Sequence, residues 1–437
     1  MNSEKQSTNL QMTLREVNRV GEVKKNIPKL RFRGYEDAWE QRKFGNIIQI
    51  ERGGSPRPIE EYITTSSDGL NWVKIGDAPN QGNYITSTSE KIRPEGLSKT
   101  REVYPGDLIL SNSMSFGKPY IMAIKGCIHD GWLLLRDKNN YFDLIFLCNL
   151  LGTPQMLQQY KGLAAGSTVN NLNKELVSST QVCIPNIEEQ KTIGIFFETI
   201  DNLITLHQRK YDALKSMKKT LLSKMFPKNG EDVPEIRFKE FTDAWEQRRL
   251  EEIFLKIRNA FVGTSTPYYV EKNQGGHFYI ESNNVKHGKI NHDTEVFINE
   301  EFYQNQKDKW LKTGDIVMVQ SGHVGHSAVI PEYLNNSAAH ALIMFQEYKI
   351  ETNPYFINFQ FQTESVRNKI DSITTGNTIK HILASDMKLF SISNTQKKEA
   401  DKLGDFFISL DNLITLHQRK LDGLKNMKKT LLQQMFV

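Results

Sequence analysis

Two nearly identical segments, 210 positions apart, strongly constrain how this chain of 437 residues can fold. Residues 201–226 read DNLITLHQRKYDALKSMKKTLLSKMF and residues 411–436 read DNLITLHQRKLDGLKNMKKTLLQQMF, so 21 of 26 positions are identical. A second repeat lies upstream, where PKLRFRGYEDAWEQR at 28–42 recurs as PEIRFKEFTDAWEQR at 234–248. The repeated unit is therefore half the chain, and unlike residues separate the two copied segments within each half.

The longer repeat is predicted to be a helix because its apolar residues recur every three and four positions. Pro185 before the first copy and Pro227 after it are natural ends. We expect two helices of about 40 residues, each roughly 60 Å long at about 1.5 Å per residue. The seven-residue spacing predicts a coiled coil. The short connection at 227–233 favours an antiparallel pair, which would place the two unlike segments at opposite ends about an approximate two-fold axis.

The expected interface positions of the helices are equivalent in the two copies. They are Leu203, His207, Leu214, Met217 and Leu221 in the first helix, and Leu413, His417, Leu424, Met427 and Leu431 in the second. The two histidines place a polar group on the apolar seam. A register-setting role is favoured over a metal or catalytic site, because no cysteine or second histidine lies at ligand spacing.

The unlike segments mix short apolar runs with turn residues and are typical of α/β domains. We therefore expect an α+β fold, with two α/β-type domains separated by two long antiparallel coiled-coil helices in a pseudo-two-fold repeat. The expected parts are a polar tail at 1–27, a first domain at 28–185, a first spacer helix at 186–228, a second domain at 229–393 and a second spacer helix at 394–437.

Composition narrows the class of protein. No stretch approaches the roughly 18 to 20 apolar residues of a membrane span, and the first 27 residues, expected to be a loose tail, lack the apolar run of a secretory signal. Cys127, Cys148 and Cys183 fit neither a disulfide framework nor a zinc site, so a reducing cytoplasm is expected. The net charge of +5 permits a nucleic-acid partner without establishing one.

Both unlike segments carry loops rich in hydrogen-bonding groups. Loops at 111–118 and 320–326 each follow a predicted buried strand. Near the end of each segment lies a glycine turn with hydroxyls, AGSTV at 165–169 and TGNTI at 375–379. Its backbone amides could hold a phosphate, or it could be an ordinary turn capped by Ser or Thr.

The order of these features resembles the specificity subunits of Type I restriction–modification systems. The likeness covers nearly the whole chain: the repeated helix, the Arg-Phe to Trp-Glu motif at 31–40 and its copy at 237–246, the Gly-Ser-Thr turn, and IPNIEEQ at 184–190 leading into the first helix. The second half departs from the last motif, reading SISNTQKK at 391–398, which leaves the start of its helix open.

The resemblance implies that each domain is a target-recognition domain that reads one half of a split, asymmetric DNA sequence. The helices would fix the gap and dock two methyltransferase subunits, and restriction/translocase subunits would complete a complex for adenine N6 methylation and restriction. This chain would have no catalytic centre and no metal site. S-adenosylmethionine, ATP and magnesium would belong to the partner subunits.

Candidates for DNA contact are side chains that offer donors and acceptors to bases or phosphates, although each is also compatible with a solvated surface position. In the first domain they are Lys74, Lys91, Arg93, Arg101, Asn112, Lys118, Ser167, Thr168 and Asn170. In the second domain they are Lys256, Arg258, Asn283, Asn284, Lys286, Gln320, His323, Asn377, Thr378, Lys380 and His381. Matched helix lysines could form two equivalent docking surfaces or simply face solvent: Lys215, Lys218, Lys219, Lys425, Lys428 and Lys429.

Two other classes of protein are weighed against this hypothesis. A DNA-modifying enzyme is disfavoured because NPYF at 353–356 lacks the second proline of the adenine-methyltransferase motif, and no Gly-x-x-x-x-Gly-Lys-Ser/Thr loop exists. Glu189-Gln190-Lys191 lacks the Pro-Asp partner of a nuclease. A coiled-coil scaffold that does not bind DNA would not explain why divergence is confined to two matched domains.

Overall fold

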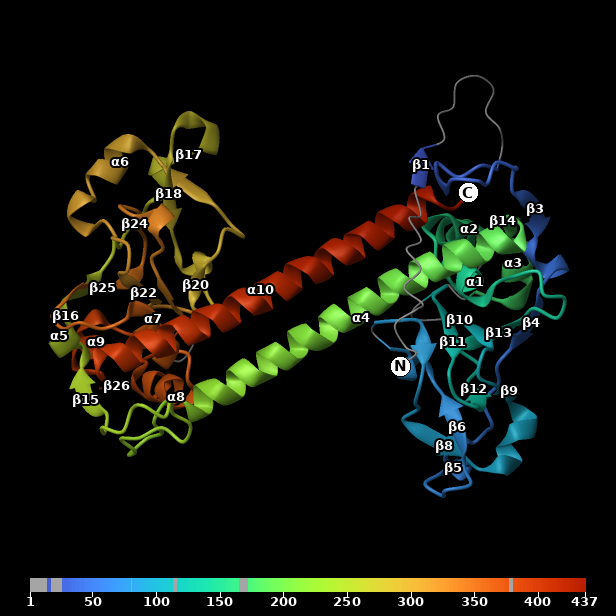
Figure 1. Ribbon diagram of the computed structural model, residues 1–437, viewed down its shortest axis with the longest axis horizontal. Helices are drawn as coiled ribbons and strands as arrows, with labels where there is room; N and C mark the ends of the chain where they lie inside the picture. Colours follow the sequence, from blue (N-terminus) through green and yellow to red (C-terminus); the bar gives the residue numbers. More distant parts are fainter. Residues whose placement is uncertain (1–13, 17–25, 80, 113–115, 165–171, 377–379) are drawn as a thin grey trace, which may run out of the picture. The chain divides into compact units, whose positions relative to one another are not determined.

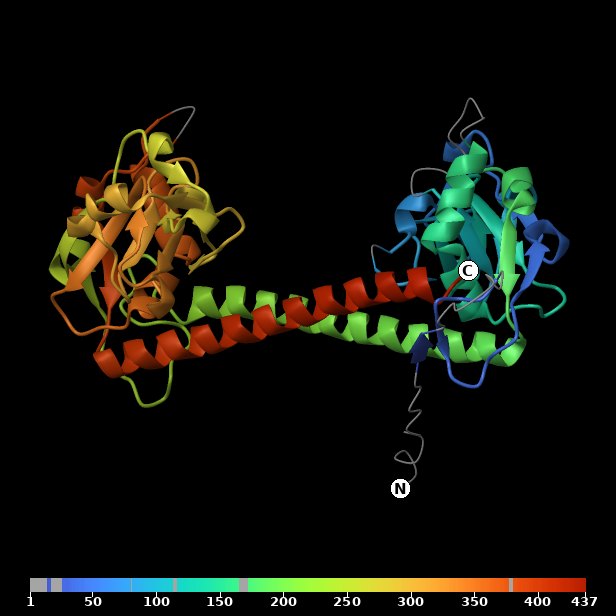
Figure 2. The same cartoon turned by 90° about the horizontal axis from the view of Figure 1, so that it is seen from above.

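The computed structural model describes residues 14–16, 26–79, 81–112, 116–164, 172–376 and 380–437. The protein divides into two compact units (Figure 1). The first unit consists of residues 1–209 and 418–437, and the second unit consists of residues 210–417. Each unit contains one mixed α/β domain and the adjoining parts of two long helices, which run along one side of that domain (Figure 2).

The repeated segments form two long helices of equal length. Helix α4 spans Ile187–Lys224 and helix α10 spans Lys397–Gln434, 38 residues each. Their first residues are 210 positions apart, as the two repeats are. The altered sequence before the second copy therefore does not displace the start of its helix.

Within each unit the two helices run antiparallel. In the first unit Lys428 Nζ lies 2.6 Å from Asp201 Oδ1, and in the second unit Lys218 Nζ lies 2.7 Å from Asp411 Oδ1. Each ion pair joins an early residue of one helix to a late residue of the other, and the two pairs are copies of each other. The predicted antiparallel pairing is confirmed in both units.

The phase of the buried seam differs from the sequence expectation. Six expected positions are buried or half-buried: His207, Leu214, Leu221, His417, Leu424 and Leu431. Four others are exposed by 40–46%: Leu203, Met217, Leu413 and Met427. The residues directly after these four lie in the seam instead, and two of them are the ion-paired lysines Lys218 and Lys428. A lysine can fill a seam position because its hydrocarbon stem packs while its ammonium group pairs with an aspartate.

The domain of the first unit contains two five-stranded sheets. The first sheet has the order β4 (Gln49–Arg52), β13 (Trp132–Arg136), β10 (Leu108–Ser111), β11 (Pro119–Met122) and β7 (Tyr84–Ile85). The second has the order β5 (Ile63–Thr64), β8 (Glu90–Ile92), β6 (Leu70–Val73), β12 (Gly126–Ile128) and β9 (Arg101–Val103). The β7–β11 and β6–β12 pairs are parallel, and the other pairs are antiparallel. Strand β3 (Glu40–Lys43) pairs with β14 (Gln181–Ile184), and the short helices are α1 (Leu144–Leu151), α2 (Pro154–Ala164) and α3 (Lys174–Ser179).

The domain of the second unit has the same plan with smaller sheets. Its first sheet has the order β16 (Phe254–Asn259), β25 (Leu342–Tyr348), β22 (Ile316–Val319) and β23 (Ser327–Val329). Its second sheet has the order β17 (Tyr269–Val270), β21 (Val296–Ile298), β18 (His277–Ile280) and β24 (Ala338–Ala339). Two-stranded pairs are β19 (Val285–Lys286) with β20 (Lys289–Ile290), and β15 (Glu246–Arg249) with β26 (Ser391–Asn394). The helices are α5 (Leu250–Ile253), α6 (Glu300–Gln304), α7 (Pro354–Gln360), α8 (Glu364–Ile373) and α9 (Ala384–Leu389).

Repeated aromatic residues join each domain to its helices. In the first unit the buried rings of Trp39 and Phe436 meet edge to face with centroids 6.1 Å apart. In the second unit Trp245 and Phe226 do the same at 6.0 Å. The tryptophan comes from the upstream repeat and the phenylalanine from the end of the helix repeat. Aromatic burial at this junction explains why both segments are kept in both halves.

A buried ion pair ties the upstream repeat to the start of each long helix. Arg31 donates to both carboxylate oxygens of Glu189, at 2.7 and 2.8 Å, and Arg237 donates to both oxygens of Glu399, each at 2.7 Å. Both glutamates are fully buried. Arginine suits this position because its planar guanidinium group matches a carboxylate with two parallel hydrogen bonds.

Part of the segment expected to be a loose tail is ordered. Strand β1 (Leu14–Glu16) pairs antiparallel with β2 (Leu30–Phe32). The cysteines are all free, with two buried and Cys183 half-buried. Among the described residues, none of the helices is long and apolar enough to cross a membrane.

Candidate nucleic-acid interface

Two equivalent loops follow the central strands of the two domains. Residues 112–118 connect β10 to β11, and residues 320–326 connect β22 to β23. All four residues of β10 and of β22 are buried. The apolar strands therefore fix where each loop begins and ends, while the residues of the loops differ between the two units.

In the second unit, the loop brings together candidates from two distant segments. Ile382 N donates to Gln320 O at 3.0 Å, and Gly322 N donates to Lys380 O at 3.2 Å. His381 pairs through its backbone with Thr375 in both directions. The exposed side chains of His323, Lys380 and His381 and the half-buried side chain of Gln320 therefore belong to one local surface.

The half-buried His326 contacts this surface. Its ring stacks on that of His323, with centroids 5.6 Å apart and an interplanar angle of 17°. Burial lowers the pKa of His326, and nearby Arg367, His323 and His287 add to the effect. A neutral His326 leaves the positive charge of this region on the exposed lysine and arginine side chains.

The corresponding surface in the first unit is built on the same backbone pattern. Leu172 N donates to Asn112 O at 2.9 Å, which joins the loop to the segment that follows the glycine turn. Lys118 lies over the Tyr120 ring, 5.0 Å from its centroid. The candidates Ser167, Thr168 and Asn170, together with Asn377 and Thr378 in the second unit, lie outside the described residues.

Two candidate asparagines have structural roles. Asn112 is buried and donates its amide to Asp130 O at 2.9 Å. Asn284 is buried and donates to Asn291 O and Thr294 O, while its own oxygen accepts from Glu281 N. Burial with these hydrogen bonds is the usual state of a polar side chain that shapes a loop, and it leaves neither amide presented to a base.

The other candidates lie elsewhere on the two domains. In the first unit, Lys74, Lys91, Arg93 and Arg101 all lie in or next to strands of the second sheet. Lys74 pairs with Glu90 at 2.6 Å and Arg101 with Glu51 at 3.2 Å. In the second unit, Lys256 and Arg258 lie on β16, while Asn283 and Lys286 are exposed near the β19–β20 hairpin. Lys74 and Arg101 could still contact phosphate. Because both already pair with carboxylates, the loop surface is the better candidate for DNA contact.

The chain belongs to a known family, as a comparison with family models establishes. The model described as the Type I restriction modification DNA specificity domain matches residues 36–216 and 242–426. This chain is a member of that family. Each match covers one α/β domain and most of the long helix that follows it, which is the same unit that the internal repeat defines.

Curated relatives match nearly the whole chain. The Type I restriction enzyme MjaVIII specificity subunit of Methanocaldococcus jannaschii is 21% identical over 90% of this chain and 91% of its own length. The putative Type I restriction enzyme MjaX specificity subunit of the same organism is 22% identical over 93% of this chain and 95% of its own length.

Solved structures support the fold. The S subunit of a Type I restriction–modification system from M. genitalium covers 94% of this chain and 99% of its own, with a TM-score of 0.58 and 15% identity. A chain from a structural study of assembly and conformational transition of the Type I system covers 91% of this chain and 97% of its own, with a TM-score of 0.52 and 14% identity.

Both enzyme-like motifs of the sequence have structural roles. Asn353 caps helix α7 by accepting from Tyr355 N at 2.9 Å, and Phe356 is fully buried in the core. Glu189 is the buried partner of Arg31. Among the described residues, no three His, Cys, Asp or Glu side chains gather closely enough to hold a metal ion.

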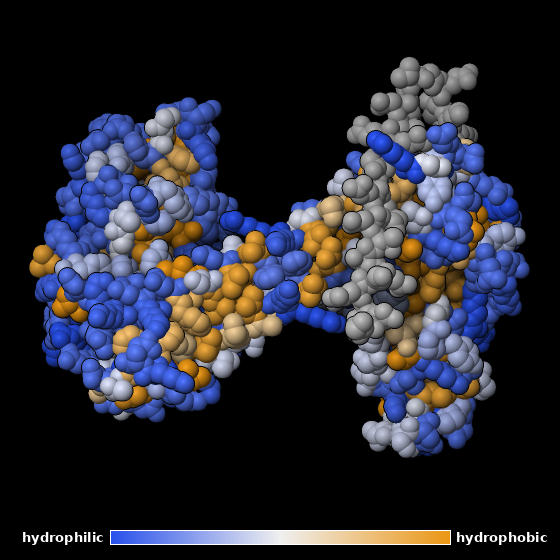
Figure 3. Space-filling model, viewed as in Figure 1, coloured by the Kyte–Doolittle hydropathy of each residue, from blue (hydrophilic) through white to orange (hydrophobic). Residues whose placement is uncertain are grey.

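Exposed apolar residues lie on the helix pair of each unit (Figure 3). The first patch consists of Leu203, Leu206 and Met427, and the second patch consists of Leu413, Leu416 and Met217, with 40–46% of each side chain exposed. The two patches are copies, 210 positions apart. Leu203 and Met427 each directly precede a seam residue, so they face the same side of the antiparallel pair within the first unit, as do Leu413 and Met217 within the second.

The sequence analysis missed several residues beside the second loop. Arg367 on α8, and His287 and Lys289 of the β19–β20 hairpin, line a cavity together with residues of both long helices. The hairpin and α8 lie about 80 residues apart in the chain and share no motif, so only the fold brings Arg367 close to the other two. The cavity is therefore a finding of the structure.

Proposed function

We propose that this chain directs a Type I restriction–modification complex to a bipartite DNA target, with one half read by each α/β domain. One observation carries the proposal. Both domains are built on the same frame, with the same buried Arg–Glu pair and Trp–Phe junction, yet their projecting loops have different residues. A conserved frame with two different loop sets suits an asymmetric target with two unlike halves.

The loop surface of the second unit offers suitable chemistry for reading DNA. Gln320 can give adenine a donor and an acceptor in the major groove, and His323 and His381 can offer a donor to a base edge. Lys380 is suited to a backbone phosphate, which would fix the position of the domain on the duplex. In the first unit Lys118, the last residue of the β10–β11 loop, is likewise suited to a backbone phosphate.

The two apolar patches suit two copies of a methyltransferase partner. Equivalent surfaces on a repeated chain can bind two identical subunits in the same way. An exposed apolar patch on a helix is well suited to docking another helix. Restriction subunits would join the same complex.

In this proposal the chain itself is not catalytic. The partner subunits would carry S-adenosylmethionine, ATP and magnesium, and the complex would act in the cytoplasm. The chain would place a target adenine where a methyltransferase subunit can flip the base out of the duplex.

Direct DNA binding tests the proposal. The complex of this chain with its methyltransferase partner is titrated with duplex DNA that contains the target, across a range of salt concentrations. Lys380→Gln should weaken binding and lower the slope of log K against log salt by about 0.9, the value for one lost phosphate contact. Lys388→Gln, an exposed lysine on α9, serves as the control and should match the wild type. Equal binding by wild type, Lys380→Gln and a Gln320→Ala, His381→Ala variant would favour the scaffold alternative.

A further inference from the structure

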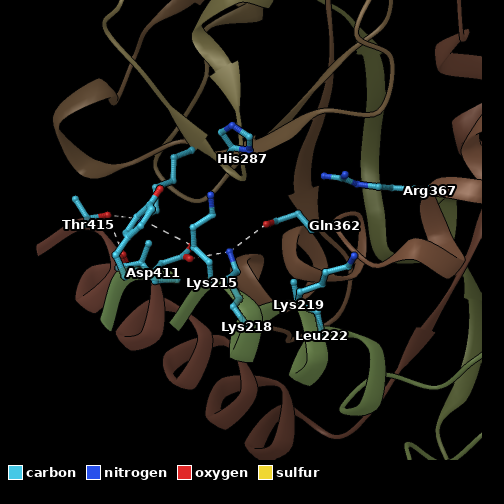
Figure 4. Close-up of a pocket in the computed structure, with 12 residues that line it drawn as sticks. Lys215, Lys218, Lys219, Leu222, His287, Gln362, Arg367, Asp411 and Thr415 are labelled. Carbon is cyan, nitrogen blue, oxygen red and sulfur yellow. Dashed lines mark hydrogen bonds and ion pairs between the residues drawn. The ribbon is translucent and has the colours of Figure 1, made fainter. Parts of the chain in front are cut away.

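The second unit contains an open cavity of about 380 Å³ between its helix pair and its α/β domain (Figure 4). Helix α4 contributes Lys215, Lys218 and Lys219, helix α8 contributes Arg367, and the β19–β20 hairpin contributes His287 and Lys289. Figure 4 shows the three α4 lysines, Arg367 and His287 approaching the cavity from different elements. The volume lies within the range of roughly 300 to 1,000 Å³ that is common for small-molecule sites.

The charge of this cavity is strongly positive. Among its described lining residues are five lysine or arginine side chains and one carboxylate, that of Asp411, which leaves a net charge of +4. Asp411 is already engaged, since Lys218 Nζ lies 2.7 Å and Lys289 Nζ 3.9 Å from its two oxygens. Several cations held close together repel one another, so an anion that enters the cavity would gain a large electrostatic attraction.

One of the lining cations, Lys218, is held in place by several contacts. Lys218 Nζ also donates to Gln362 Oε1 at 3.3 Å and lies 5.0 Å from the centroid of the Phe359 ring. Its side chain is only 14% exposed. A lysine fixed in this way loses little conformational freedom on binding an anion.

The hairpin turn is fixed as well, by a hydrogen bond from helix α7. His287 has φ 52° and Gly288 has φ 81°, so both residues of the turn are left-handed. Gly288 O accepts from Asn358 Nδ2 at 2.9 Å, and a Cβ on Gly288 would lie 2.3 Å from Gln362 Nε2. Positive φ at both central residues is the usual geometry of a two-residue hairpin turn, so the hairpin itself sets the position of His287.

The first unit lacks the complete set of residues that line this cavity. Its helix carries Lys425, Lys428 and Lys429 at the positions of the three α4 lysines, but the position equivalent to Arg367 is Leu157, and that equivalent to Tyr211 is Leu421. The helix lysines are therefore part of the repeat, whereas the arginine belongs to the second unit. This difference supplies matched positions for a control.

We propose that this cavity binds phosphate groups. Lysine and arginine side chains are the usual ligands of phosphate oxygens, and arginine can contact two of them at once. The phosphates would come either from a free nucleotide or from the backbone of DNA bound by the second unit. The second source rests on the proposed function, and the first does not.

The test uses the full chain with pyrophosphate and ATP as probes, measured by isothermal titration calorimetry without magnesium. The wild type should bind pyrophosphate at one site. A Lys219→Gln, Arg367→Gln variant should bind it at least about tenfold more weakly, because two charged ligands are removed. A Lys429→Gln, Lys425→Gln variant, which changes the corresponding helix of the first unit, should bind like the wild type. Thermal unfolding of each variant shows that the fold is retained, and Lys215→Gln provides a second, milder change at the same cavity.

A competition experiment with duplex DNA identifies the source of the phosphate, and fluorescence anisotropy measures the displacement of the DNA. If pyrophosphate displaces DNA and the Lys219→Gln, Arg367→Gln variant binds DNA with a smaller salt dependence, the cavity holds the DNA backbone. If ATP and DNA bind independently, the cavity is a nucleotide site. Pyrophosphate binding that is equally strong in the wild type and this variant, with unchanged DNA binding, would overturn the proposal. If the wild type and its variants all fail to bind DNA while pyrophosphate binding is intact, the result would instead count against the proposed function alone.

Discussion

Single residues explain why the upstream repeat is kept in both halves. Arg31 and Arg237 each reach a glutamate in the first turn of a long helix and form two hydrogen bonds to it. A buried carboxylate without its arginine would be costly, so neither partner can change alone. The sequence analysis recognised the Arg-Phe motif but not its partner, because about 160 residues separate the two in the chain.

Removing one member of this pair should destabilise the first unit. Arg31→Met should lower the free energy of unfolding by about 3–5 kcal/mol, because it leaves a buried, uncompensated charge on Glu189. The exposed pair of Arg42 and Glu40 gives the control, and Arg42→Met should cost no more than about 1 kcal/mol. Urea denaturation measures both. Equal losses in the two variants would show that burial of the ion pair is not what matters.

A second residue-scale prediction concerns pH. His340 Nε2 faces Gly263 O at 3.0 Å and its Nδ1 lies 3.5 Å from Glu281 Oε1, and only the imidazolium form donates from both nitrogens. The hydrogen bond with Glu281 raises the pKa of His340, and the same bond lowers the pKa of Glu281. The stabilisation is lost as pH rises through the raised histidine pKa, and also as pH falls through the lowered glutamate pKa.

The pair should therefore contribute most between pH 4.5 and pH 6.5, the ordinary pKa values of a glutamate and a histidine. His340→Gln should destabilise the second unit most near about pH 5.5 and progressively less above the histidine pKa. Urea denaturation across pH, compared between His340→Gln and wild type, measures this. A stability difference that does not change with pH would contradict the ion pair.

At the scale of elements, the two long helices were predictable and their exact seam was not. The three- and four-residue spacing gave their length, and the short connection gave their antiparallel direction, which is confirmed. The seam was shifted because lysines occupy two of its positions through pairing with aspartates of the other helix. The apolar residues that the spacing assigned to the seam instead form part of the two exposed patches.

These patches lead to a prediction about stoichiometry. Leu413→Gln with Leu416→Gln removes the second patch, and the complex should then hold one methyltransferase subunit per chain instead of two. Native mass spectrometry of the purified complex measures the ratio. The control is Leu383→Gln with Leu389→Gln, two leucines of the same unit that are 57% and 62% exposed outside the long helices. Retention of two subunits by the Leu413, Leu416 variant would place the docking surface elsewhere.

At the scale of the whole molecule, the internal repeat was sufficient to predict two α/β domains and two antiparallel helices. It could not reveal which loop residues meet, because Gln320 and Lys380 come together only through backbone contacts between distant segments. It also could not identify the buried asparagines, since burial depends on the packing of the surrounding loops. Residues that the two halves share therefore build the common fold, and residues that differ between the halves are the candidates for recognising the target.

Two unlike domains on a common frame should read two unlike half-sites of the DNA. The most direct measurement is to express the chain with its methyltransferase partner in a host without DNA methylation and map N6-methyladenine by single-molecule sequencing. We expect one split, asymmetric motif methylated on both strands, and exchange of residues 249–393 with those of a relative should change only one half of it. A stable complex that methylates no defined motif, or an exchange that alters both halves together, would show that the two domains do not read separate half-sites.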